Sequence, residues 1–116
     1  MKLLLSLMLV LAPMVAIADT GRPTFKEVEG LALSGDYQAQ RDLAYGYSSW
    51  PYPGQQKSAT LACAWRIVII RSGNKRVNET DVGSRQVYCD KLDKTSRQAA
   101  EAQAVEILVK IARGAR

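Results

Sequence analysis

Residues 34–47 read SGDYQAQRDLAYGY, and this stretch ends one helix and begins the next. Gly35 can adopt the left-handed backbone conformation that closes a helix, and the side chain of Asp36 can cap the first turn of the helix that follows. Three positions then recur every fourth residue and share one helical face: Ala39, Leu43 and Tyr47. A helix stop followed at once by a helix start is typical of repeated helix pairs.

The segments on either side extend this pattern. A first helix is predicted over residues 24–33, between Pro23 and Gly35, and a second over residues 37–48. In the second helix Ala39 and Ala44 allow a neighbouring helix to approach closely. The stretch SSWPYPG, residues 48–54, must be a loop because a proline lacks the amide donor that a helix requires.

A third helix is predicted over residues 58–72 and should be the most buried one, because LACAWRIVII, residues 61–70, is apolar on nearly every side. The β-branched residues 67–70 are also compatible with a core strand, but the uninterrupted length and the alanines favour a helix. Arg66 interrupts this apolar helix. Its side chain either reaches the edge of the core or meets a carboxylate such as Asp42.

Ser72-Gly73-Asn74 repeats Ser34-Gly35-Asp36 at a spacing of 72 − 34 = 38 residues. A period of about 20 to 50 residues is typical of solenoids built from stacked helix pairs. A fourth helix is predicted from about residue 80, with apolar residues Val82, Val87, Tyr88 and Leu92. A fifth is predicted over residues 95–112, with inward positions Ala100, Ala104, Ile107, Leu108 and Ile111. The predicted fold is therefore all-α, about five helices forming a short αα solenoid of antiparallel hairpins.

Residues 1–18 have the pattern of a secretory signal peptide. Lys2 supplies the positive start, residues 3–12 are largely apolar, and Ala16-Ile17-Ala18 fits a cleavage site before Asp19. The apolar run is about half of the roughly 20 residues that span a bilayer, so an uncleaved membrane anchor is disfavoured. Cleavage would leave 116 − 18 = 98 residues, a single domain over residues 19–116 that is periplasmic or secreted.

Cys63 and Cys89 are the two cysteines, and in an oxidising compartment such a pair is more often bridged than free. We therefore expect one disulfide. A zinc site is not expected, because the chain has no histidine and two thiols do not complete a tetrahedral set. No other metal ligand set or cofactor motif is recognised.

The charge favours a protein partner over nucleic acid. The chain has 16 Lys and Arg and 11 Asp and Glu, and removal of Lys2 leaves 15 − 11 = +4. These cations are scattered along the sequence, which is typical of a solvated surface and not of a nucleic-acid site. Without histidine, catalysis would need paired carboxylates such as Asp36 with Asp42 or Asp90 with Asp93, which helix caps and solvated faces explain better. We expect a non-enzymatic, monomeric protein.

Two aromatic residues of the 48–54 loop are the candidate contact site. Trp50 and Tyr52 are braced by Pro51 and Pro53 and would form a stiff amphipathic surface. Two tyrosines at the end of the preceding helix are candidates for the same surface: Tyr45 and Tyr47. The alternative is that one or both rings of the loop fold back to cover a small core.

Several of these residues resemble the Sel-one-like repeat family, a relative of the tetratricopeptide repeat. Gly35-Asp36, Ala39-Gln40, Leu43-Ala44 and Tyr47 are similar to its first helix. Ala62 to Trp65 and the turn containing Gly73 are similar to its second helix and closing turn, and Arg85, Leu92 and residues 101–104 to a terminal segment. The loop at residues 49–56 departs from the family's glycine-rich, acidic loop, and the glycine after Leu43 is displaced. The resemblance implies an all-helical adaptor that binds proteins and carries over no catalytic residue.

The sequence thus predicts an exported helical-repeat protein that binds a protein partner, as an adaptor or in an immunity or inhibitor role. The alternative is a basic module that binds anionic polymers of the cell envelope, which the charge of +4 motivates. The identity of the partner is not predicted.

Overall fold

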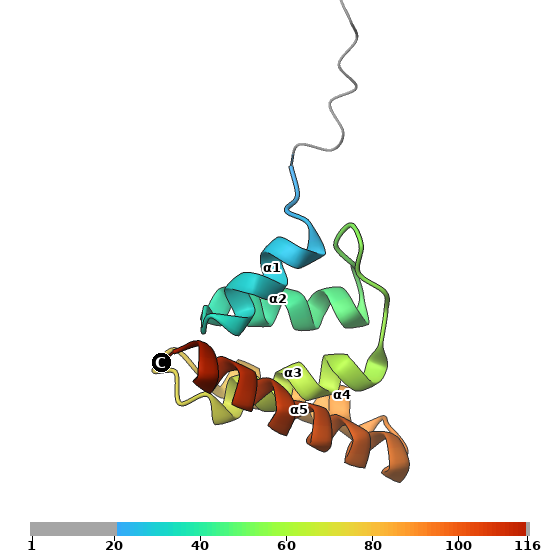
Figure 1. The fold of residues 1–116 in the computed structure, drawn as a ribbon. Coiled ribbons are helices and arrows are strands. Elements are labelled where there is room, and N and C mark those ends of the chain that lie inside the picture. The colour runs from blue at the N-terminus through green and yellow to red at the C-terminus, as the bar shows by residue number, and fades with distance from the viewer. Residues whose placement is uncertain (1–20, 116) are drawn as a thin grey trace, which may run out of the picture.

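The computed structural model describes residues 21–115, which form five α-helices and, within that range, no β-strand (Figure 1). This confirms the all-α class, the five helices and the helical state of residues 67–70. The predicted signal peptide, residues 1–18, lies outside the described residues. The helices are α1 (Phe25–Leu33), α2 (Tyr37–Ser48), α3 (Ala59–Arg71), α4 (Glu79–Asp90) and α5 (Lys94–Gly114).

Each helix begins at a polar residue whose side chain accepts a hydrogen bond from the first turn. Asp36 Oδ1 accepts from the backbone amide of Ala39 at 2.8 Å, and Ser58 Oγ accepts from that of Leu61 at 3.1 Å. Both caps were predicted from the sequence. Each such cap stabilises its helix by about 1 kcal/mol. The complete set of capping residues is Thr24, Asp36, Ser58, Asn78 and Asp93.

The turns after α1 and α3 have matching geometry. Ser34 Oγ donates a 2.7 Å hydrogen bond to the Leu31 carbonyl, and Ser72 Oγ donates one of the same length to the Ile69 carbonyl. The following glycines have φ angles of 97° at position 35 and 73° at position 73. Because these angles lie in the left-handed region, glycine is the favoured residue at both positions. The two turns then diverge, since α2 follows Asp36 directly whereas α4 begins only at Glu79.

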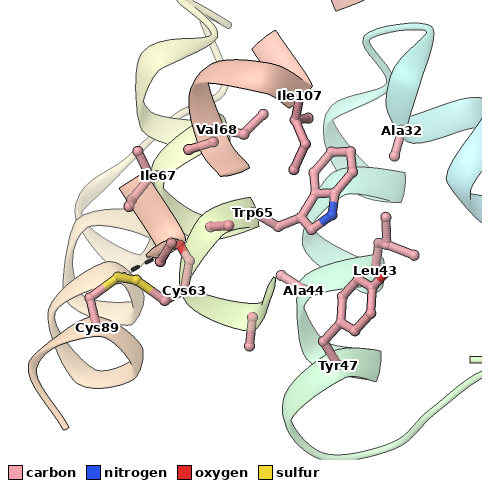
Figure 2. Packing of buried hydrophobic residues seen from close by; sticks show 14 of the residues in the cluster. Ala32, Leu43, Ala44, Tyr47, Cys63, Trp65, Ile67, Val68, Cys89 and Ile107 are labelled. Atoms are coloured by element: carbon pink, nitrogen blue, oxygen red, sulfur yellow. Dashed lines mark hydrogen bonds between the residues drawn. A yellow bond between two sulfur atoms is a disulfide. The ribbon is translucent and has the colours of Figure 1, made fainter. Parts of the chain in front are cut away.

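The central helix is α3, which packs against α2, α4 and α5, while α1 packs mainly on α2 (Figure 1). Residues 62–69 of α3 are buried without interruption. Figure 2 shows Trp65 pointing from α3 toward Leu43 and Tyr47 of α2, with Ile107 of α5 beside it. One apolar core therefore includes residues of all five helices, and α3 is its most buried member, as predicted.

The apolar residues of α4 do not all face this core. Val82 and Val87 are 46% and 63% exposed, whereas Asp81 and Cys89 are the buried residues of this helix. The physical reason is that α4 packs on α3 through one narrow face, and the two valines lie to the side of it.

Along residues 21–115, no helix is both long enough and apolar enough to cross a bilayer.

Candidate functional site

The Trp50 loop, residues 49–58 between α2 and α3, is held in place by the buried side chain of Gln55. Gln55 Nε2 donates a 3.1 Å hydrogen bond to the Leu43 carbonyl of α2, and Gln55 Oε1 accepts one of 3.0 Å from the Tyr52 amide. The amide of Phe25, at the start of α1, donates to the Pro53 carbonyl at 3.0 Å. The loop is therefore attached to both neighbouring helices and has a defined conformation.

Arg22, just before α1, packs on the aromatic residues of this loop. The centre of its guanidinium lies 4.0 Å from the ring centroid of Trp50 and 4.5 Å from that of Tyr52. The same group donates hydrogen bonds to the carbonyls of Pro51, at 3.0 Å, and Trp50, at 3.2 Å. Cation–π contacts of this kind contribute about 0.5–1 kcal/mol at exposed sites, so Arg22 stiffens the Trp50 loop.

The two aromatic residues of the loop have different surroundings. Trp50 is 61% exposed, whereas Tyr52 is half-buried and packs against the core. One ring of the loop therefore folds back on the core, as the alternative prediction has it, and the other remains at the surface. Burial raises the pKa of the Tyr52 hydroxyl, while Arg22 acts on that pKa in the opposite direction.

The two tyrosines of α2 also separate. Tyr45 is 47% exposed, one turn before the Trp50 loop. Tyr47 is buried, and its ring meets that of Phe25 edge to face with centroids 6.0 Å apart. Tyr47 belongs to the floor of a cleft of about 270 Å³ between α1, α3 and α5 and is not part of an exposed surface with Trp50.

Sequence reasoning missed Arg22 and Gln55, the two residues that fix the loop. Arg22 stands 28 residues before Trp50, and nothing in its local sequence indicates where its side chain goes. Gln55 is buried, although glutamine in a loop between helices is ordinarily a surface residue. The one local signal was Gly46, which leaves space on α2 for a side chain of the loop.

A second polar site lies where α2, α3 and α4 meet, and we call it the arginine cluster: Arg41, Arg66 and Arg76 around Tyr37 and Asp81. The carboxylate of Asp81 is almost fully buried, with 1% of the residue exposed. Asp81 Oδ2 accepts a 2.5 Å hydrogen bond from the Tyr37 hydroxyl, and Asp81 Oδ1 lies 3.2 Å from Arg41 Nε. These contacts link the first turn of α4 to α2.

Tyr37 stays protonated in this cluster. Burial, and then the hydrogen bond to Asp81, raise the pKa of its hydroxyl, while the charges of Arg41 and Arg76 lower it. The guanidinium groups of Arg41 and Arg76 lie 5.4 and 5.0 Å from the Tyr37 ring centroid. The ring of Tyr37 thus lies near two cations, and its hydroxyl donates a hydrogen bond to the single carboxylate of the cluster.

Arg66 neither reaches the edge of the core nor pairs with Asp42, so both predicted outcomes are wrong. It is buried, with 7% of its surface exposed, and its guanidinium lies 5.3 Å from the Tyr88 ring centroid. Arg66 Nε has no hydrogen-bond partner among the described residues. The physical reason is that the face of α3 bearing Arg66 is covered by α4 and its Tyr88, which keeps the side chain away from open solvent. Burial lowers the pKa of Arg66.

Cys63 of α3 and Cys89 of α4 have sulfur atoms 2.08 Å apart, the distance of a disulfide bond, as Figure 2 shows. This confirms the predicted pairing.

A cleft of about 200 Å³ lies beside the Cys63–Cys89 disulfide and includes Arg85 and Glu101. Glu101 forms an ion pair of 2.8 Å with Arg71 and a longer one of 3.8 Å with Arg85, which joins α5 to α3 and α4.

The residues that resemble the repeat family form the core and the turns of this fold. Ala39, Leu43, Ala44 and Trp65 are buried in the core, and Gly35 and Gly73 form the two matching turns. Within residues 21–115 no group of three His, Cys, Asp or Glu side chains is arranged to hold a metal ion. Comparison with protein-family models, curated proteins and solved structures found no match to this chain.

Proposed function

We propose that this chain is an exported, non-enzymatic helical-repeat protein of the Sel-one-like type that binds another protein. Three observations support the proposal. Residues 1–18 have the pattern of a signal peptide, Cys63 and Cys89 lie at disulfide distance, as is common in oxidising compartments, and the Ser34 and Ser72 turns have matching hydrogen bonds. In this view α2 and α3 form the central hairpin of a short solenoid. The role is that of an adaptor, or of an immunity or inhibitor protein in the periplasm.

The exposed ring of Trp50 on a braced loop is the observation that carries the binding role. Tryptophan is enriched among the residues that dominate binding energy at protein interfaces. Arg22, Gln55 and Phe25 already hold the loop, so little conformational entropy would be lost when a partner covers the ring. Tyr45 lies one turn before the loop and extends the surface along α2.

The test is an affinity capture from periplasmic extract with the wild type, Trp50→Ala and Val105→Ala. Val105 is a matched control because it is 53% exposed but lies on α5. We expect one protein to be captured by the wild type and by Val105→Ala and to be lost with Trp50→Ala. Equal recovery by all three proteins would exclude the Trp50 loop as the contact site.

A basic module for anionic envelope polymers is the second candidate function. The observation that favours it is the arginine cluster, in which Arg41 pairs with Asp81, Arg76 lies over the Tyr37 ring and Arg66 lies over the Tyr88 ring. Binding of this kind would weaken strongly as salt is added, because it depends on screened charges. Tight, salt-insensitive binding to a single protein would exclude it.

A further inference from the structure

The cleft between α1, α3 and α5 has an apolar floor of fixed shape. It exists because α1 packs mainly on α2 and only lightly on α5. Leu61 and Trp65 of α3 and Ile107 of α5 line it, and Figure 2 shows Ile107 beside the Trp65 ring. Its volume of about 270 Å³ is below the roughly 300–1,000 Å³ of pockets that hold whole small molecules. A cleft of this size suits one long side chain.

The walls of this cleft carry more negative than positive charge. Glu29 of α1 is partly exposed and Glu106 of α5 is exposed, so solvent reaches both carboxylates. Within residues 21–115 neither of them forms an ion pair. Lys110 is the one cation among the lining residues, which leaves 1 − 2 = −1 in a chain whose net charge is +5. The cleft therefore favours a cationic group.

Gln103 of α5 adds a third acceptor to the same walls. Its Oε1 atom is shielded from water and has no hydrogen-bond partner in the described part of the chain. A shielded acceptor without a donor is unfavourable, so a donor that enters the cleft would stabilise the complex. Burial and then the charge of Glu29 raise the pKa of the Tyr47 hydroxyl to about 12, so the Glu29 carboxylate lies close to the floor of the cleft.

The cleft is also next to the Trp50 loop. A neighbouring cleft of about 430 Å³ shares Tyr47 and Leu61 with it and reaches Gly54 and Ser58 of the loop. One partner can therefore contact the loop and the cleft together.

We propose that this cleft binds one arginine side chain of the protein partner. This inference rests on the protein-binding function proposed above and names the chemistry of the partner. The apolar stem of an arginine can pack on Trp65 and Ile107 while its guanidinium stays at the polar walls. A guanidinium has several donors in one plane and is less strongly hydrated than the ammonium of lysine, so it can serve separate acceptors at once. An apolar side chain would leave those acceptors unpaired.

The experiment is a magnetic-resonance titration of the protein with the blocked peptide acetyl-Ala-Arg-Ala-amide and with the same peptide containing citrulline, which keeps the shape of arginine without its charge. Trp50 and Trp65 are the two tryptophans, and Trp50→Phe identifies which indole signal belongs to each. We expect the Trp65 signal to shift and the Trp50 signal to stay. The arginine peptide should bind about tenfold more tightly than the citrulline peptide.

Glu29→Gln should weaken binding of the arginine peptide about fivefold or more and leave binding of the citrulline peptide unchanged. Glu106→Gln, at an exposed position that folding does not depend on, is the second variant and should weaken it as well. Glu79→Gln is the matched control, because it removes an exposed carboxylate from α4, outside the cleft, and should bind like the wild type.

The proposal is overturned if the two peptides bind equally, or if both cleft variants retain the affinity of the wild type. It is also overturned if the corresponding lysine or leucine peptide binds more tightly than the arginine peptide. Capture of a partner that is lost with Trp50→Ala but retained with Glu29→Gln and Glu106→Gln would leave the protein-binding function in place and remove only the arginine site.

Discussion

The side-chain amide of Gln55 occupies the space next to Gly46 that a Cβ atom at position 46 would need. A Cβ built on Gly46 would lie 2.9 Å from Gln55 Cδ and closer still to Oε1. Gly46 is in the middle of α2, where glycine is ordinarily unfavourable. Its presence there is explained by Gln55, whose two hydrogen bonds join the Trp50 loop to the helix.

Gly46→Ala should destabilise the protein by about 1–3 kcal/mol. The added methyl group displaces Gln55, and the buried amide and the Leu43 carbonyl then lose their hydrogen bond, which outweighs the better helix propensity of alanine. Gly83→Ala is the matched control because position 83 of α4 has no neighbouring atom within 4 Å, and it should stabilise by about 0.5–1 kcal/mol. Denaturant unfolding of the two variants gives both values, and a stabilising Gly46→Ala would contradict this account.

The helices could be predicted because their signals are local. Asp36 caps a backbone amide only three residues away, and Gly35 and Gly73 close helices through their own φ angles. The disulfide was also predictable, because only one pairing of two cysteines exists. The caps and turns depend only on neighbouring residues in the sequence, and the disulfide could be assigned because no other cysteine is available. Neither prediction requires knowing how the helices pack.

The sites could not be predicted in the same way because they depend on packing between distant residues. Tyr37 and Asp81 are 44 residues apart, and no pattern in the sequence indicates that their side chains form a buried hydrogen bond. The sequence marked Arg66 as an exception within an apolar helix, but whether it would find a carboxylate depended on where α4 lies. The sequence does not distinguish Trp50 from Tyr52. Their exposed fractions differ because Tyr52 packs against the core and Trp50 does not.

Asp81→Asn should cost about 3 kcal/mol of stability. The substitution removes the anion paired with the partly exposed Arg41 and leaves the buried guanidinium of Arg66 without a nearby counter-charge. Glu79→Gln, two residues earlier in the first turn of α4, is the control and should have a small effect because its side chain is exposed. Thermal and denaturant unfolding should separate the two variants clearly, and similar midpoints would show that the buried ion pair does not stabilise the fold.

Reduction of the Cys63–Cys89 disulfide should lower the free energy of unfolding by about 3.5 kcal/mol. The bond joins residues 26 apart, and the chain-entropy model assigns this value to a loop of that length in the unfolded chain. Because both cysteines are buried between α3 and α4, the double variant Cys63→Ala/Cys89→Ala should show a similar loss. Unfolding with and without reductant measures the effect. Exported protein that contains two free thiols by mass analysis would contradict the bond itself.

The stability of the fold should decrease in alkaline solution through Tyr47. Burial, followed by the nearby charge of Glu29, raises the pKa of the Tyr47 hydroxyl from 10.0 to about 12. Because the folded pKa lies above the unfolded one, this stabilisation is fully present below pH 10 and is lost as the pH rises toward 12. The free energy of unfolding should fall by about 1–2.5 kcal/mol across that window, since each pKa unit corresponds to about 1.4 kcal/mol. Tyr47→Phe lacks the ionising group and should lose less stability over the same range, measured by denaturant unfolding at each pH. An identical decline in both proteins would assign the alkaline sensitivity to other residues.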